Sequence, residues 1–142
     1  MSAVDLVADI RRAGQEAWCE GNVDALDAVY APDYVSHSPP LPDTRGLAAV
    51  KESITATRIA YSNIRAEYAE WIVEGHAIAY RFTMYMKHTG ISPTLPDPPT
   101  GKEVLLTGCA WVHLRNGKVI EEWEYSNYLG FLQQLGVVPP LG

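Results

Sequence analysis

The chain has 142 residues, of which 47% are hydrophobic and 20% are charged, and this composition is typical of one globular domain rather than of a disordered or fibrous chain. Eleven Lys and Arg residues against seventeen Asp and Glu residues leave a net charge of −6. This balance argues against nucleic-acid binding, because phosphate neutralisation needs clustered cations. The sequence predicts neither a membrane span nor a signal peptide, so we expect a cytoplasmic protein with Cys19 and Cys109 as free thiols.

The first 61 residues have the pattern of three helices. Ser2 with Asp5 three positions later resembles a capping box, and apolar residues then recur at helical spacing as far as Gly21. Asn22 is expected to cap a second, short helix, and a third helix is expected to begin at residues 44–46. The stretch before it contains four prolines, so it predicts a connection with only a brief extended piece.

The rest of the sequence has the pattern of strands. Alternating apolar residues predict strands at 64–73, 77–88, 104–115 and 119–127, and a short helix follows at 128–135. Asn116-Gly117 predicts a type I′ turn between the last two strands. Residues 1–142 are therefore expected to form a single α+β domain, with three N-terminal helices packed in a curved, mainly antiparallel sheet of at least four strands. A sheet that curves into a cone around the helices would enclose one deep pocket.

One face of the strand 77–88 is apolar. This face carries Tyr80, Phe82 and Met84, which are expected to bind substrate in the pocket. Because every second residue of a strand lies on the same face, the face ends at His88. The pKa of an imidazole at the end of an apolar stripe can be tuned for proton transfer, so His88 is the first candidate for a catalytic base. The alternative is a solvated histidine at a strand end.

The last strand has a mixed aromatic and polar face. Trp123, Tyr125 and Asn127 share this face by alternation, and they resemble a wall that orients a ligand. Asn127 is a candidate catalytic donor to a carbonyl or enolate oxygen, and the alternative is that it only caps the final helix. Glu122 and Glu124 fall on the opposite face.

Two further histidines are candidates. His113 shares a face with Trp111, which is expected to bind substrate, on the strand before the turn, and His113 either serves the pocket or is a structural histidine of the sheet. In the proline-rich connection Tyr34 is expected to bind substrate, and His37 is expected either to lean over the pocket mouth and bind substrate there or to be an exposed loop residue. The patterns of nucleophile elbows, dinucleotide sites, P-loops and HExxH metal sites do not occur, so no metal is expected.

The sequence contains, in this order between about Trp18 and Pro139, the segments GNVDALDAVYAPDYVSHSP, RGLAAVKES, HTG followed by PPTGK, RNGKVIEEWEYSN and LQQLGVVP. Together they resemble the SnoaL-like polyketide cyclases of the nuclear transport factor 2-like superfamily. The resemblance implies helices and a curved sheet around a deep pocket. It also implies acid–base chemistry on an enolisable polyketide without a metal or redox cofactor.

Two features differ from the family pattern. The cyclases have an Asp as general acid/base where this sequence has Asn127, and the loop after Gly90 is longer and lacks the family's aromatic residue. An amide has no titratable proton near neutral pH, so Asn127 cannot replace that base. By the resemblance, His37, His88 and His113 match histidines of the family.

These observations predict an enzyme that cyclises or isomerises a polyketide-like or polycyclic carbonyl compound, with His88 or His113 as the base. The alternatives are an accessory or hydroxylase-type protein of polyketide tailoring, or a protein that only binds such a ligand. The predicted partners are a small hydrophobic or aromatic polyketide-like ligand and a second copy of the chain. A homodimer is expected from the resemblance and because the strand 104–115 is apolar on both faces.

Overall fold

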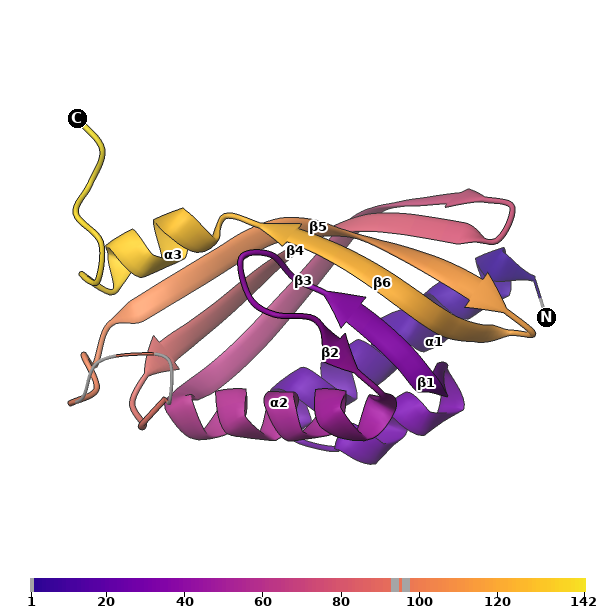
Figure 1. Cartoon of the computed structure of the whole chain (residues 1–142), viewed down its shortest axis with the longest axis horizontal. Coiled ribbons are helices and arrows are strands. Elements are labelled where there is room, and N and C mark those ends of the chain that lie inside the picture. The colour runs from indigo at the N-terminus through magenta and orange to yellow at the C-terminus, as the bar shows by residue number, and fades with distance from the viewer. Residues whose placement is uncertain (1, 93–94, 96–97) are drawn as a thin grey trace.

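One curved sheet of six strands lies over two helices in the computed structural model, which describes residues 2–92, 95 and 98–142 (Figure 1). The helical segments are α1 (Ala3–Gly14), a π-helical turn η1 (Gln15–Cys19), a 3-10 helix η2 (Val23–Ala28), α2 (Leu47–Ala60) and α3 (Tyr128–Gln134). The strands are β1 (Tyr30–His37), β2 (Thr44–Arg45), β3 (Tyr61–Glu74), β4 (Ala77–His88), β5 (Glu103–Arg115) and β6 (Lys118–Ser126). The predicted α+β class is confirmed.

The N-terminal half matches the expected helices only roughly. The capping box is present, because the backbone N–H of Asp5 donates to Ser2 Oγ at 3.3 Å and that of Ser2 donates to Asp5 Oδ2 at 3.1 Å. The expected second helix is the 3-10 helix η2, and Asn22 makes no side-chain cap there. None of the described helices is long and apolar enough to cross a membrane.

The proline-rich connection contains a full strand, so the expectation of only a brief extended piece was wrong. β1 pairs in parallel with β6 and antiparallel with β2. Pro32 lies where the β1–β6 register shifts, between Tyr30 and Val35, and a proline without an N–H is tolerated at such an irregularity. The remaining prolines of the connection follow the strand.

The other strands form an antiparallel meander, as predicted. The strand order is β2-β1-β6-β5-β4-β3. Asn116 and Gly117 both have positive φ, at 51° and 74°, as a type I′ turn requires. The turn therefore sits between β5 and β6, where the sequence placed it.

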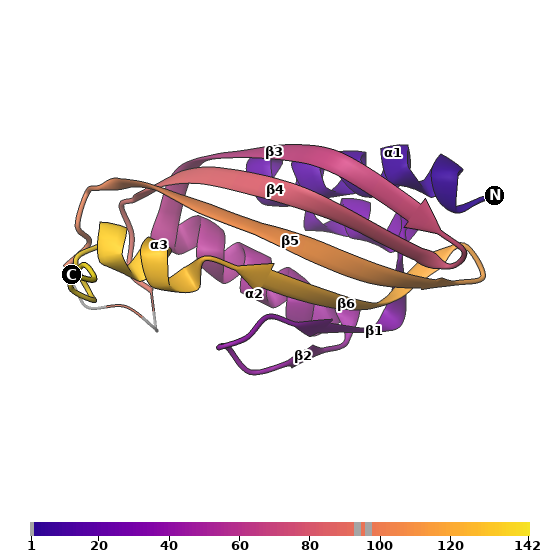
Figure 2. The ribbon, with the colours of Figure 1, turned by 90° about the horizontal axis from the view of Figure 1, so that it is seen from above.

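The two faces of the sheet have different surroundings. Helices α1 and α2 lie beneath the inner face in Figure 1, and buried side chains such as Ile78, Val112 and Val119 fill the space between the layers. Figure 2 looks down on the outer face, and no described element lies over β4 and β5 there. Any enclosed site must therefore lie on the inner side.

Candidate functional site

A cavity of about 360 Å³ opens between the inner face of the sheet and the helices. It has the size of a ligand site. β1, β3, β4 and β6 line it from the sheet, α2 lines it from below, and α3 contributes at one end. Its wall is strongly aromatic, with side chains of Trp18, Tyr30, Tyr34, Tyr61, Tyr68, Tyr80, Phe82, Tyr128 and Phe131.

The apolar face of β4 points into this cavity. Tyr80, Phe82 and Met84 line it, as the alternation predicts, and Tyr34 reaches it from β1. The placement of these four side chains agrees with the sequence, while their role in binding a substrate stays a prediction.

The face predicted for β6 was wrong. Leu114 pairs with Val119, but the next pair is His113 with Glu121, so Ile120 is an extra residue that forms a bulge. A one-residue shift turns every later side chain to the other side of the sheet. Beyond Ile120 the residues that line the cavity are therefore Glu122, Glu124 and Ser126.

The residues expected to form the pocket wall lie on the outer face instead. Trp123 pairs with Trp111 and Tyr125 pairs with Cys109 across β5 and β6, and Trp111 and Tyr125 are 53% and 57% exposed. Asn127 caps α3, because its Oδ1 accepts a hydrogen bond from the N–H of Gly130 at 2.9 Å. The structure thus favours the capping alternative for Asn127.

Glu122 is held by two phenols in the depth of the cavity. The hydroxyl of Tyr34 donates to its Oε2, and the hydroxyl of Tyr80 donates to its Oε1 at 3.2 Å. Burial raises the pKa of the Glu122 carboxyl, although both hydrogen bonds favour its ionised form. The phenols are buried too, and this raises the pKa of Tyr34 and Tyr80 well above the usual 10. They are therefore fixed as hydrogen-bond donors.

Glu124 lies two residues further along the same inner face. Ser38 donates a hydrogen bond to its Oε2 at 3.2 Å. Burial, and then repulsion by the nearby Glu122 carboxylate, raise the pKa of Glu124 to about 7. This carboxyl can therefore both release and accept a proton at neutral pH.

None of the four histidines is among the described residues that line this cavity. His88 is 1% exposed, and its Nδ1 accepts a hydrogen bond from the backbone N–H of Thr100 at 3.1 Å. It borders a separate hollow near the C-terminal end of α3, and Tyr61 of the cavity wall packs against its ring. The structure therefore does not place His88 where a cavity ligand would lie.

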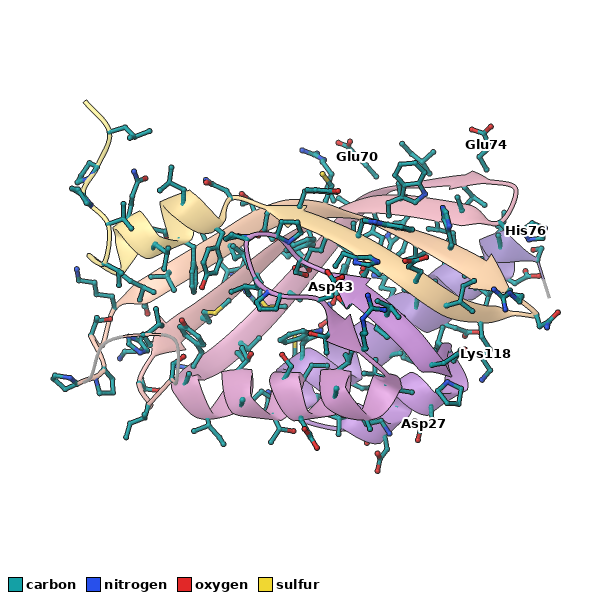
Figure 3. All side chains as sticks on the ribbon, viewed as in Figure 1. Asp27, Asp43, Glu70, Glu74, His76 and Lys118 are labelled. Carbon is teal, nitrogen blue, oxygen red and sulfur yellow. The ribbon has the colours of Figure 1, made fainter. Side chains whose placement is uncertain are left out.

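His113 and His37 lie on the outer side of the sheet. The ring of His113 packs edge-on against Trp123, at 4.9 Å between centroids. His37 stacks on the same Trp123 ring. Its Nε2 lies 2.6 Å from Glu121, and its Nδ1 lies 2.9 Å from Asp43, which Figure 3 labels in the loop before β2. The pKa of His37 is raised first by the hydrogen bond to Glu121 and then by that to Asp43.

Sequence reasoning missed Glu122 and Glu124 as pocket residues. A signal existed in β5, where Ala110 and Val112 alternate with bulkier or polar residues and are 3% and 0% exposed. Their cross-strand partners are Glu124 and Glu122, and directly opposed residues of an antiparallel pair point to the same face. That signal can be used only when the pairing register of β5 and β6 beyond the bulge is known.

Comparison with known proteins agrees with the fold. The model of the SnoaL-like polyketide cyclase family matches residues 8–135. A proposed polyketide cyclase from Acidithiobacillus ferrooxidans is 25% identical, with a TM-score of 0.81 over 96% of this chain and 98% of that one. TsrD from Streptomyces laurentii is 21% identical, with a TM-score of 0.84 over 97% and 99%.

AclR from Streptomyces galilaeus, a proposed hydroxylase, is 22% identical, with a TM-score of 0.82 over 99% of this chain and 87% of that one. No curated protein sequence matches the chain significantly.

Proposed function

The chain belongs to the SnoaL-like polyketide cyclase family, and on that premise we propose that it converts a small, polyketide-like carbonyl compound by proton transfer in the cavity. The reaction is a cyclisation or isomerisation at an activated carbon. Glu124 is the general acid/base, and Glu122, held by its two tyrosines, helps to keep the pKa of Glu124 near neutral pH.

The observation that carries this proposal is the pKa of Glu124 of about 7 inside an aromatic cavity. A catalytic acid/base is most effective when its pKa is close to the operating pH. A strongly shifted titratable group in a ligand-sized cleft is also the usual mark of a functional site. In the ionised state Glu124 can take a proton from a carbon next to a carbonyl, and in the neutral state it can return that proton elsewhere.

Glu122 supports this role through its charge and its hydrogen bonds. Residues two apart on one face of a strand are about 7 Å apart along the chain, so a negative charge on Glu122 disfavours a second charge on Glu124. Tyr34 and Tyr80 hold Glu122 in place. Because the cavity contains these two carboxyls, the Asn at position 127 does not remove acid–base chemistry from this chain. Glu124 also replaces His88 and His113 as the proposed base.

Hydrogen exchange with a generic ketone tests the proposal without knowledge of the substrate. We use 2-tetralone, a bicyclic ketone with acidic benzylic protons, and follow its deuterium uptake by NMR. The protein is expected to accelerate exchange, and Glu124→Gln is expected to reduce the acceleration by about 10²–10⁴. Glu74→Gln, the same change at an exposed site far from the cavity (Figure 3), is the matched control and is expected to have no effect.

Two results would contradict the proposal. Equal acceleration by the Glu124→Gln variant would remove Glu124 from the chemistry. No acceleration by the unmodified protein, together with tight binding of the ketone, would favour the alternative of a protein that only binds such ligands.

We also propose that the outer face of the sheet is covered by a second copy of the chain. Trp111 and Tyr125 expose large aromatic surfaces there, and exposed apolar sheet faces are commonly interfaces. Sedimentation velocity at micromolar concentration is expected to show a dimer, and Trp111→Glu is expected to yield monomers that remain folded. A monomeric unmodified protein would contradict this assignment.

A further inference from the structure

All charged side chains among the described residues that line the cavity are acidic. Glu122 and Glu124 both line it, whereas no Lys, Arg or His occurs among its described lining residues. The partners of these carboxyls are neutral hydroxyls, namely Tyr34 and Tyr80 for Glu122 and Ser38 for Glu124. The cavity therefore has two half-buried acids and no counter-charge among its described lining residues.

Such an arrangement is costly when the cavity is empty. Buried carboxylates are normally paired, because an isolated ion loses its hydration without compensation. Here the hydroxyls offset only part of that loss, and protonation has to offset the rest. A positively charged ligand would supply the missing partner and would favour the ionised form of both groups.

The rings around the carboxyls are suited to the same kind of ligand. Tyr30 and Tyr34 meet edge-on at 4.8 Å between centroids, and Tyr68 meets Tyr80 in the same way at 5.7 Å. These four rings belong to β1, β3 and β4, and all four line the cavity. Aromatic faces attract organic cations, most strongly when the cation is desolvated.

We propose that the cavity selects an apolar ligand that carries a basic nitrogen, with the ammonium group placed between the Glu122 and Glu124 carboxyls and the surrounding tyrosine rings. The same arrangement repels carboxylates, phosphates and sulfonates. The inference concerns the ligand of the site described under the proposed function, but it rests on charge and ring geometry and does not require that Glu124 transfers a proton.

Three probes of nearly equal shape test the proposal. Benzyltrimethylammonium is a permanent cation, neopentylbenzene replaces its nitrogen by carbon, and phenylmethanesulfonate is an anion. Binding is followed by tryptophan fluorescence, since Trp18 lines the cavity. At about pH 8 the cation is expected to bind at least about tenfold more tightly than neopentylbenzene, and the anion is expected not to bind.

The two carboxyls should account for that preference. Glu122→Gln and Glu124→Gln are each expected to weaken cation binding by about tenfold and to leave neopentylbenzene within about threefold. Glu74→Gln, an exposed carboxyl away from the cavity, is the matched control and should change neither affinity. Thermal melting establishes that each variant is folded.

The preference should also depend on pH. The titratable groups near Glu124 are Glu122 on β6, Tyr30 on β1, Tyr68 on β3 and Tyr80 on β4, and Tyr34 of β1 bonds to Glu122. The phenols stay neutral in the working range, so the two carboxyls determine the pH dependence. The affinity for the cation is expected to fall as the pH is lowered through about 7, while that for neopentylbenzene stays constant.

The inference is overturned if the cation and neopentylbenzene bind equally, if the cation does not bind at millimolar concentration, or if both Gln variants keep the preference. These outcomes are independent of the exchange assay. A cation preference without Glu124-dependent exchange leaves the ligand class standing and removes the proposed reaction. Glu124-dependent exchange without a cation preference leaves the proposed reaction standing and removes the ligand class.

Discussion

Val119 and Glu122 point to the same side of β6, although three positions separate them in the sequence. Val119 is fully buried beneath the sheet, and Glu122 lines the cavity on that same side. Strict alternation would put them on opposite faces. The bulge at Ile120 brings them together, and it thereby directs the two carboxyls inward and the aromatic residues outward.

Deletion of Ile120 should therefore remove the bulge and keep both faces of β6. Without the extra residue Glu121 follows Val119 directly and still pairs with His113, so Glu122 stays opposite Val112 on the inner face and Trp123 stays opposite Trp111 on the outer face. We expect the deletion variant to keep a cooperative thermal transition and to lose less than about 3 kcal/mol in the free energy of unfolding. Ile120→Ala, which keeps the bulge, is the control and should cost about 1 kcal/mol. Loss of the cooperative transition on deletion would contradict the assignment of Ile120 as the unpaired residue of the bulge.

The bulge at Ile120 is also the feature of the site that could not be predicted from the sequence. The capping box at Ser2, the alternation along β4 and the turn at Asn116-Gly117 depend on neighbouring residues, and the structure confirms all three. The bulge at Ile120 depends on pairing with a strand on either side, so the local pattern of β6 gave the wrong face. β1 was missed for a related reason, since its parallel partner is about ninety residues away.

Tyr34→Phe should destabilise the protein through Glu122. The variant removes one of the two phenolic donors to a half-buried carboxyl, which leaves that group less well compensated. We expect a loss of about 1–3 kcal/mol in the free energy of unfolding near neutral pH, measured by urea denaturation. Tyr128→Phe makes the same change at another ring of the cavity wall, whose hydroxyl bonds to no described residue, and it should lie within about 0.5 kcal/mol of the unmodified protein. Equal effects of the two changes would contradict the assigned role of Tyr34.

Glu124 should reduce stability as the pH rises. Its folded pKa of about 7 lies above the ordinary 4.5, so the folded state holds a proton that the unfolded state has already lost between these values. The contribution of this group to the free energy of unfolding therefore falls between about pH 4.5 and about pH 7 and is constant above that pH. The whole decrease is about 3 kcal/mol. Glu124→Gln should be more stable than the unmodified protein above about pH 7 and should lose that advantage near pH 4.5. An advantage that does not change with pH would be inconsistent with a raised pKa.

His37 should show the same sign, starting from its own ordinary pKa. Its folded pKa lies above the ordinary 6.5 because of Glu121 and Asp43, so its contribution to stability is complete below about 6.5 and is lost as the pH rises through the folded value. NMR titration of the His37 ring is expected to show that raised pKa, and Glu121→Gln should lower it more than Asp43→Asn. A His37 pKa that neither variant changes would contradict the ion-pair cluster.

The proposed chemistry depends most directly on the ionisation of Glu124, which carbon NMR can measure without any ligand. Protein labelled with ¹³C at the glutamate side-chain carboxyls is titrated, and the Glu124→Gln variant identifies the resonance of Glu124. A carboxyl that titrates with a pKa of about 7 is the predicted result, and it would establish a buried acid/base poised at neutral pH. A pKa near the ordinary 4.5 would contradict both the inward placement of Glu124 and its proposed chemistry.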